Sequence, residues 1–535
     1  MRNLCLTVRT FFMAALFSCG FTPIVAVCDP LFMVSSPQVQ QLKALYRQAD
    51  EDFPTDSFPL SARDLNGFAA SLQSRVHSAA LSSDIEQYVR VLEYSPGDLR
   101  LDLDNSVSYG RYDSTGGHQM SFDDRLKYID PLAQAKWYFG FDGGPSFHVE
   151  AGLYRDFNQN GNDSIPHPQE GKPLCFEDNT VRQGYLYVPF GFGDITFGRQ
   201  QLQIGPSDLS SLSAAEHIPF YDALRARVFM GPLTMTEIVA TLSNNETLQE
   251  KEAGVTPTGT NYGYGITTIF YLIHYFEWSF PHARAGIGAQ YLVSRENNTF
   301  TLVDFFPAVS WHDLNVQLSN MCLIADATLT PLPNFDLYFQ GGLDDVNLNS
   351  LGIDDSPIPT IWAYLVGVRY NQTIWGIPIM ATLEWGSTHY LWGNYASNPG
   401  TRDGYLSSSI YRMQLDDGDQ SIPLTSPYGP GVNWLIAQLS AAGPNGLAGA
   451  MRFTMERQNT LANLYTTLYQ QDSSVENAPY STLLIFELIA SYEWAEMIKV
   501  NVDPRLVARD GNFWLELYLH LRFRCDYQTR ITSSR

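Results

Sequence analysis

Charged residues are scarce in this chain of 535 residues. They make up 17% of it, against about 25% in typical soluble domains. A chain in which half of the strand positions face lipid, and whose long loops are built from Asn, Ser, Thr and Tyr, has this composition. The few charges are mostly negative, 33 basic against 56 acidic residues, with a net charge of −23. Such a balance repels phosphates and excludes nucleic acid as a partner.

Cysteine and long hydrophobic runs are also nearly absent. Beyond the N-terminus the chain has only Cys175, Cys322 and Cys525, an odd and widely spaced set that defines no disulfide framework and no zinc site. The most apolar later stretch, Ile266 to Phe280, contains His274 and Glu277 and is too short and polar for a spanning helix.

Motifs of catalysis are missing as well. The sequence has no Gly-x-Ser-x-Gly elbow, no His-Glu-x-x-His helix, no phosphate loop and no dinucleotide-binding glycine pattern. The acid pairs beginning at Asp344, Asp354 and Asp416 fall in predicted loops and are interpreted as solvated turns. We therefore expect no enzyme and no cofactor.

One loop has a partial metal motif. Asp156, Asn158, Asn160 and Gly161 match the first half of a calcium-binding loop, but His167 occupies the place of the bidentate Glu. A polar surface loop is the alternative, and we expect no metal.

The N-terminus is typical of an exported protein. Arg2 and Arg9 precede an apolar run from Phe11 to Val27, which predicts a signal peptide over residues 1–28. Cleavage after Cys28 is favoured, and lipidation of Cys19 is the alternative. Residues 29–97 are predicted to form a small helical periplasmic region, in which Ser61 and Asp64 resemble a helix cap.

From residue 98 the hydrophobic period changes to that of β-strands. Leu99, Leu101 and Leu103 alternate with charged residues, and the pattern recurs to the end of the chain. Its longest example is Phe513 to Arg524, twelve residues in strict alternation. Strands in soluble sandwiches run to about 5 or 6 residues, whereas a tilted membrane strand needs about 9 to 11. The fold class predicted is all-β, a transmembrane antiparallel β-barrel over residues 98–525 with a polar tail over 526–535.

Short turns such as Pro333-Asn334 alternate with long polar loops such as residues 393–431, the arrangement of a bacterial outer-membrane barrel. At roughly 24 residues per strand and connection, about 18 strands are expected, within a range of 16 to 20. Outer-membrane lipid is the expected partner, and the oligomeric state is left open. Aromatic residues near strand ends are candidates for interfacial girdles: Tyr109, Tyr112, Tyr154, Tyr185, Tyr187, Trp362, Tyr364, Trp375 and Trp385.

Alternation also predicts a polar lumen. The side chains expected to face it in structural roles are those of Arg199, Glu516, His520 and Arg522, with Arg199 as an ion-pair partner inside the barrel. Replacing Leu517 or Leu519 on the lipid face by Arg is expected to cost about 2 to 4 kcal/mol. No ligand-binding residue is identified.

The central part of the chain resembles the capsule-assembly Wzi family of outer-membrane proteins. The similar segments are residues 197–200 (Phe-Gly-Arg-Gln), 204–206 (Ile-Gly-Pro, where the family usually has Trp first), 219–225 and 231–233. Shorter likenesses follow at 334–345 and 429–439, and at 58–61 in the helical region. The resemblance implies an 18-stranded barrel that binds polysaccharide at the cell surface without catalysis.

Three functions are therefore weighed from the sequence. The first is an outer-membrane barrel that binds, anchors or helps to assemble a surface glycan. The second is a porin or solute transporter with an open lumen. The third is a secreted all-β glycan hydrolase, which would be soluble without detergent.

Overall fold

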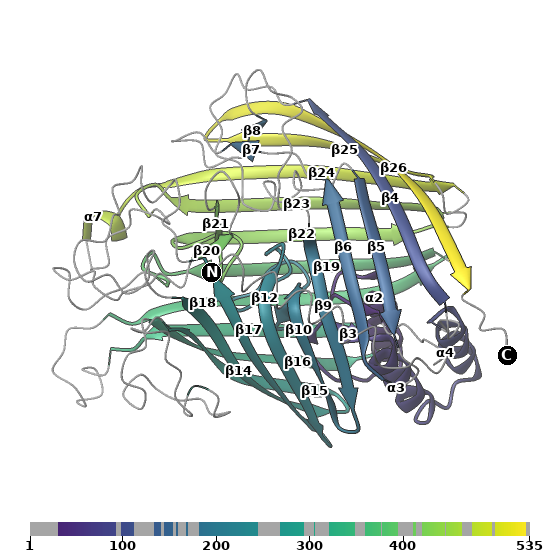
Figure 1. Ribbon diagram of the computed structural model, residues 1–535. Coiled ribbons are helices and arrows are strands. Elements are labelled where there is room, and N and C mark those ends of the chain that lie inside the picture. Colours follow the sequence, from purple (N-terminus) through teal and green to yellow (C-terminus); the bar gives the residue numbers. More distant parts are fainter. Residues whose placement is uncertain are drawn as a thin grey trace, which may run out of the picture.

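The computed structural model describes residues 30–92, 98–111, 133–140, 144–153, 157–158, 167–168, 181–243, 268–293, 304, 320–347, 359–375, 377–393, 410–413, 420–443, 446–462, 473–494 and 498–530. Within these ranges eighteen strands form one closed antiparallel barrel (Figure 1). The expected count of about 18 strands is thereby confirmed.

The barrel strands follow one another around the wall in chain order, and β26 closes the barrel by pairing with β4. Their bounds are β4 (Asp98–Arg111), β5 (Ala133–Gly140), β6 (Ser146–Leu153), β9 (Val181–Phe190), β10 (Gly193–Gln200), β12 (Tyr221–Met230), β13 (Leu233–Leu242), β14 (Ile269–Phe280), β15 (Ala283–Val293), β16 (Asn320–Leu332), β17 (Phe335–Asp345), β18 (Ile361–Ile374), β19 (Ile377–Thr388), β22 (Val432–Ala442), β23 (Leu447–Asn459), β24 (Tyr480–Trp494), β25 (Ile498–Arg509) and β26 (Asn512–Arg530).

Smaller elements form outside the barrel wall. The two-stranded pairs are β1 (Leu31–Phe32) with β3 (Leu60–Ser61), β2 (Ser57–Phe58) with β11 (Gln203–Ile204), β7 (Phe157–Asn158) with β8 (His167–Pro168), and β20 (Ile410–Met413) with β21 (Gln420–Pro423). The helices are α2 (Pro37–Gln48), α3 (Ala62–Gln73), α4 (Ala79–Leu92) and α7 (Ser473–Glu476). None of the helices in the described ranges has the length and apolar character needed to cross a membrane.

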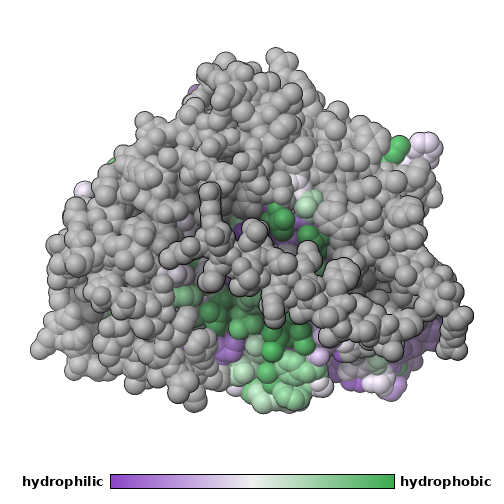
Figure 2. Space-filling model, in the orientation of Figure 1, coloured by the Kyte–Doolittle hydropathy of each residue, from purple (hydrophilic) through white to green (hydrophobic). Residues whose placement is uncertain are grey.

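Each wall strand has one apolar outward face and one polar inward face. In β17, Leu337 and Phe339 are exposed, whereas Asp336, Tyr338 and Gln340 are buried. The predicted two-sided pattern is therefore confirmed in this strand, and Figure 2 shows hydrophobic side chains gathered at the lower centre of the molecule. A closed barrel with this outward face is suited to a bilayer.

The two ends of the barrel differ in their connections. At one end the strands are joined by turns of a few residues, such as Gly191-Phe192, Gly231-Pro232 and Pro333-Asn334. At the other end lie long connections, such as residues 201–220 and 389–431, with the short turn Asp510-Gly511 as an exception. Short turns are periplasmic and long loops extracellular in such barrels.

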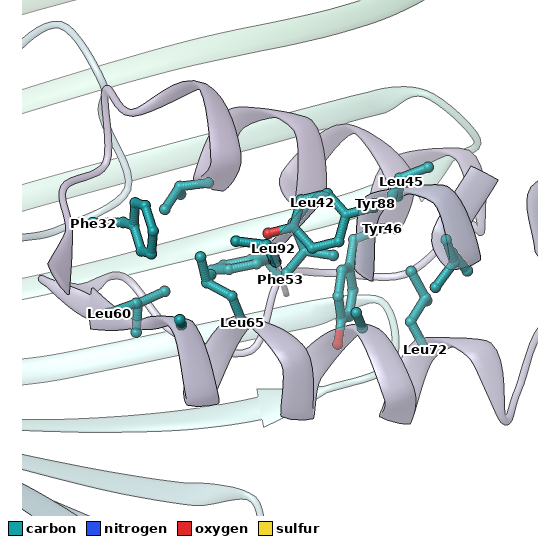
Figure 3. Packing of buried hydrophobic residues seen from close by; sticks show 14 of the residues in the cluster. Phe32, Leu42, Leu45, Tyr46, Phe53, Leu60, Leu65, Leu72, Tyr88 and Leu92 are labelled. Carbon is teal, nitrogen blue, oxygen red and sulfur yellow. The ribbon is translucent and has the colours of Figure 1, made fainter. Parts of the chain in front are cut away.

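The helical region packs at the short-turn end. The backbone N–H of Asp52 donates to Pro281 O at 2.7 Å, and that of Asn334 donates to Arg47 O at 2.7 Å. The three helices share an apolar core in which Leu42, Tyr46 and Leu65 point toward one another (Figure 3). Helix α3 begins with the expected capping box, since Ser61 Oγ accepts from Asp64 N and Asp64 accepts from Ser61 N.

The last strand is longer than predicted. Strand β26 runs to Arg530, so the first five residues of the predicted polar tail belong to the strand. The physical reason is pairing, because Asp526 to Arg530 lie opposite Asp102 to Asp98 of β4 in the register. A polar segment therefore stays in the ladder because its backbone pairs with the start of β4.

Candidate functional site in the barrel lumen

Two segments from distant parts of the chain enter the lumen and meet there. The N-terminal segment, residues 50–61, enters from the short-turn end, and the plug loop, residues 201–220, connects β10 to β12 at the other end. They pair through β2 and β11, with Gln203 opposite Phe58 and Ile204 opposite Ser57. Gly205 N also donates to Asp56 O at 3.1 Å. The two segments therefore form one continuous plug.

Two arginines of β12 fix the N-terminal segment to the wall. Asp194 receives Arg225 Nη2 at 2.6 Å and Arg227 Nη2 at 2.6 Å. Arg227 also reaches Asp64 at 2.5 Å, and Arg225 Nη1 donates to Pro59 O at 2.6 Å. All three wall side chains are fully or almost fully buried. The guanidinium forks thus hold α3 and β2 against β10 and β12.

A second cluster surrounds Arg284 of β15. Its guanidinium contacts Glu277 at 2.9 Å, Asp326 at 3.1 Å and Asp56 of the N-terminal segment. Glu277 in turn accepts from Thr55 Oγ1 at 2.6 Å and from Asp56 N at 2.7 Å. One buried cation therefore joins three carboxylates, one of which, that of Asp56, belongs to the plug.

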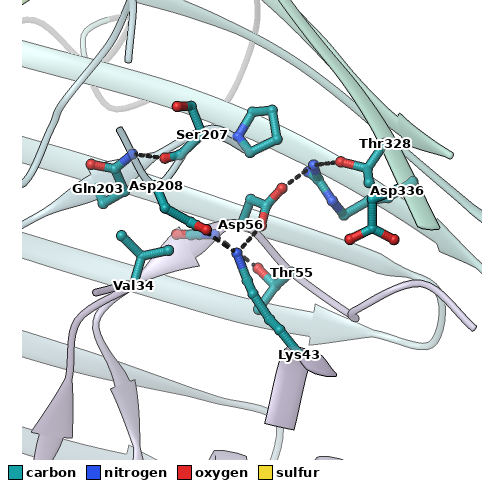
Figure 4. Close-up of polar contacts among 12 residues, drawn as sticks. Val34, Lys43, Thr55, Asp56, Gln203, Ser207, Asp208, Thr328 and Asp336 are labelled. Carbon is teal, nitrogen blue, oxygen red and sulfur yellow. Dashed lines mark hydrogen bonds and ion pairs between the residues drawn. The ribbon is translucent and has the colours of Figure 1, made fainter. Parts of the chain in front are cut away.

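The helical region is tied to the plug loop by Asp208. Lys43 of α2 lies between Asp56, at 3.2 Å, and Asp208, at 3.5 Å (Figure 4). Arg369 of β18 approaches the same Asp208 at 3.1 Å. Burial alone would raise the pKa of Asp208, but the guanidinium of Arg369 and the ammonium of Lys43 hold it below its ordinary value. Asp208 is therefore an anion that bridges wall, helix and loop.

Glu384 of β19 holds the middle of the plug loop with neutral donors. It accepts from the hydroxyls of Ser207 and Ser210, from Tyr338 Oη at 3.0 Å and from Trp434 Nε1 at 3.2 Å. Four hydrogen bonds satisfy a carboxylate that has no exposed surface. The Glu384 carboxylate and its four donors are paired in this one arrangement, so the hydrogen-bond network fixes the plug loop in place.

The opposite wall is different. Arg505 of β25 pairs with Glu487 at 2.7 Å and Asp503 at 2.9 Å, all three on wall strands. Gln438 and Ser491, on the inward faces of β22 and β24, keep part of their surface exposed. These two ion pairs lie within the wall itself, and this side of the lumen is polar.

The structure places Arg199 differently from the prediction. Its Nε and Nη2 donate to Asp222 at 2.8 and 2.9 Å, so an ion pair exists. By alternation, however, Arg199 shares the outward face of Ile195 and Phe197, which are exposed, while Thr196 is on the inward face. The lumen-facing assignment is therefore corrected, because the phase of β10 puts even-numbered residues inside.

The other predicted positions are only partly described. Glu516, His520 and Arg522 belong to β26, and the register places Glu516 opposite Arg505 and His520 opposite Asn501, but their side chains lie outside the described residues, as do those of Leu517 and Leu519. Asp344 is not a solvated turn: it is in β17 and accepts from Cys322 Sγ at 3.3 Å and Gly393 N at 2.9 Å.

The girdle candidates divide into two groups. Trp362, Tyr364 and Trp385 lie outward near the long-loop end of the wall, and Trp375 is 96% exposed in the turn after β18. Tyr185 and Tyr187 are buried on the inward face of β9, so they are not girdle residues. The side chains of Tyr109, Tyr112 and Tyr154 lie outside the described residues, as do the signal segment, Asp156 and Asn160 of the calcium motif, and the acid pairs at 354 and 416.

No family model and none of the curated proteins matches the chain. Among solved structures, one with a similar fold is Wzi of Escherichia coli, an outer-membrane protein involved in group 1 capsule assembly and described as a carbohydrate-binding β-barrel. Its TM-score is 0.58 at 12% identity, over 92% of this chain and 99% of Wzi. OpdK of Pseudomonas aeruginosa, solved with vanillate, gives 0.41 at 11% identity over 81% and 99%, and OccAB4 of Acinetobacter baumannii gives 0.40 at 8% over 80% and 98%. With its outward apolar face and closed wall, the chain is a bacterial outer-membrane β-barrel.

Proposed function

We propose that this barrel is a non-catalytic binding protein that anchors or helps to assemble a polysaccharide at the cell surface. The observation that carries the proposal is the plug, because two segments held by buried ion pairs occupy the lumen between β10 and β19. A pore for solutes needs a continuous wet path. A barrel whose lumen is occupied between β10 and β19 by its own chain is instead a rigid base for long extracellular loops, which is what surface binding requires.

The fold likeness to Wzi supports the same proposal. That protein is a carbohydrate-binding β-barrel involved in capsule assembly, and the similar segments include part of the plug loop and the strands on either side of it. A porin or transporter is the second candidate. The partly exposed polar residues on the inward faces of β22 and β24, such as Gln438 and Ser491, favour it, since they give this part of the lumen a polar surface that is not fully buried.

The full-length chain, purified in detergent, tests both candidates. It is inserted into planar bilayers to record ion current, and in parallel it is titrated with surface polysaccharide purified from the bacterium that produces it. We expect saturable binding and no steady current. A steady current without binding overturns the proposal in favour of the porin.

A further inference from the structure

The outer wall carries a cluster of aromatic rings at the long-loop end, here named the rim cluster: Trp362, Tyr364, Trp385 and His389. Trp362 is the second residue of β18, and His389 directly follows the end of β19. All four therefore lie near the extracellular edge of the wall, at the depth where lipid head groups replace hydrocarbon.

Ring contacts fix the orientation of the cluster. Trp362 and Tyr364 stack with centroids 5.4 Å apart and an interplanar angle of 24°. Trp385 meets Tyr364 edge to face at 5.2 Å and 76°, and His389 meets Trp362 at 6.1 Å and 63°. Offset-stacked and edge-to-face pairs are the favoured geometries of aromatic rings. The rings therefore form a preorganised shelf.

The shelf is accessible and differs from a simple membrane anchor. Trp385 is 46% exposed although it contacts a neighbouring ring, and Trp362 and Tyr364 are partly exposed. At the other end of the same pair of strands, Trp375 projects from a turn with 96% of its surface exposed. Trp375 therefore has the geometry of an interfacial anchor, whereas the ring of Trp385 is held in a fixed orientation by its contact with Tyr364.

Neutral hydrogen-bonding groups lie beside the rings. Ser387 Oγ donates to Asn433 Oδ1 at 2.7 Å, and the register places these two residues opposite each other on β19 and β22. By alternation Ser387 falls on the same face as Trp385. Burial lowers the pKa of His389 to about 4, so this imidazole is neutral at neutral pH. The Ser387 hydroxyl is itself buried, so the shelf combines aromatic faces with the partly exposed amide of Asn433, without a formal charge on any of them.

This chemistry matches a sugar ring. One face of a pyranose presents C–H groups that pack on an aromatic face, and its hydroxyls exchange hydrogen bonds with amide and hydroxyl groups.

We propose that the rim cluster binds a pyranose ring at the extracellular edge of the barrel. This inference rests on the proposed function and names the part of the surface at which the sugar binds. Two sources present such a ring there, the head group of a glycolipid in the outer leaflet and a free polysaccharide. Trp385 supplies the stacking face and Asn433 the hydrogen bonds.

The test compares Trp385→Ala and Asn433→Ala with the control Trp375→Ala in the full-length chain. The probes are lipopolysaccharide vesicles and the soluble surface polysaccharide used above, and binding is measured by calorimetry and by tryptophan fluorescence. We expect Trp385→Ala to weaken binding about tenfold, the equivalent of about 1.4 kcal/mol, and Trp375→Ala to leave it unchanged. Loss with vesicles alone assigns a glycolipid, and loss with both probes assigns a polysaccharide.

The failures are distinguishable. If the unaltered chain binds polysaccharide and Trp385→Ala binds it and the vesicles equally well, the rim cluster is only a membrane anchor and the inference is overturned while the proposed function stands. An equal loss of binding in Trp385→Ala and Trp375→Ala likewise overturns the inference and leaves the proposed function standing. If the unaltered chain does not bind polysaccharide, the proposed function fails, and the vesicle probe still decides whether the shelf recognises a sugar; no binding of either probe overturns both.

Discussion

The two sides of the lumen are built from the same residue types but use them differently. On the side of β10 to β19, Arg225, Arg284 and Arg369 reach across to carboxylates or carbonyls of inserted segments. On the side of β24 and β25, Arg505 pairs with Glu487 and Asp503 of the wall itself. Alternation places charged side chains inward on both sides. Such a side chain holds the plug only where its ion-pair or hydrogen-bond partner belongs to an inserted segment, and not where the partner belongs to the wall. The phase of the strands therefore does not by itself determine where the lumen is plugged.

The largest expected effect comes from removing one central cation on each side. Arg284→Met leaves Asp56, Glu277 and Asp326 buried together without their cation. This change should lower the free energy of unfolding by about 3 to 5 kcal/mol. Limited proteolysis should then cut the N-terminal segment, and urea unfolding in detergent should begin at lower concentration. Arg505→Met is the matched variant, which should lower barrel stability and leave the N-terminal segment protected. Equal proteolysis in both variants would remove the distinction between the two sides.

A charge placed on the lipid face should have the next largest effect. Leu383 is 46% exposed on the outward face of β19. Its replacement by Arg should lower the free energy of unfolding in the bilayer by about 2 to 4 kcal/mol. The matched control is Gln438→Arg on the inward face of the neighbouring β22, where a charge meets a polar lumen. Folding into vesicles, followed by heat-modifiable migration on gels, measures both. If both substitutions are tolerated equally, the assignment of the faces is wrong.

A smaller effect depends on pH. Burial raises the pKa of Asp52 to about 7, against the opposing effect of Arg284 and with a contribution from Asp56. The folded protein therefore holds this proton up to a higher pH than the unfolded chain does, and stability falls as pH rises from about 4 toward 7. Asp52→Asn should remove this part of the pH dependence and stabilise the protein above pH 7.

Urea midpoints measured across that pH range test the effect. An unchanged slope in Asp52→Asn would show that other groups carry the dependence. Asp208 acts with the opposite sign, since its lowered pKa gives stability that is present above its unfolded value and lost as pH falls through the folded one.

The smallest expected effect concerns the cap of α3. Ser61→Ala removes one half of the capping box and should cost about 1 kcal/mol. Because Asp64 both closes the box and receives Arg227, the variant should also loosen α3 from the plugged side. Ser61→Thr, which keeps a capping hydroxyl without adding a charge beside Asp64, is the control. Hydrogen exchange of α3 amides should rise in Ser61→Ala and remain low in Ser61→Thr.

Local patterns were sufficient to predict much of this fold. Strand period, turn length and the Ser61–Asp64 cap depend on neighbours in the sequence, so the barrel, its strand number and the helical region follow from them. The plug does not, because the pairing of Phe58 with Gln203 joins residues far apart in the chain. The only signal was the Ser-rich stretch after Pro206, whose hydroxyls Ser207 and Ser210 meet Glu384.

The phase of a short strand was the other weakness. Arg199 lies near the end of β10, after Gly198 with its positive φ of 125°, and the sequence around it does not alternate strictly. Tyr185 and Tyr187 were assigned by residue type, yet strand phase turns them inward. Side-chain direction is set by register with both neighbours, which the sequence of one strand does not contain.

The pairing of β2 with β11 also constrains the order of assembly. The residues that hold the N-terminal segment, such as Asp194, Arg225 and Arg284, come together only when their wall strands are aligned. The N-terminal segment can therefore be held in place only once these strands lie side by side. Closure of the wall joins β4 to β26, which are even farther apart in the chain than β2 and β11. Because contacts of long sequence separation form slowly, we expect docking of the plug and closure of the wall to be the slow steps of folding.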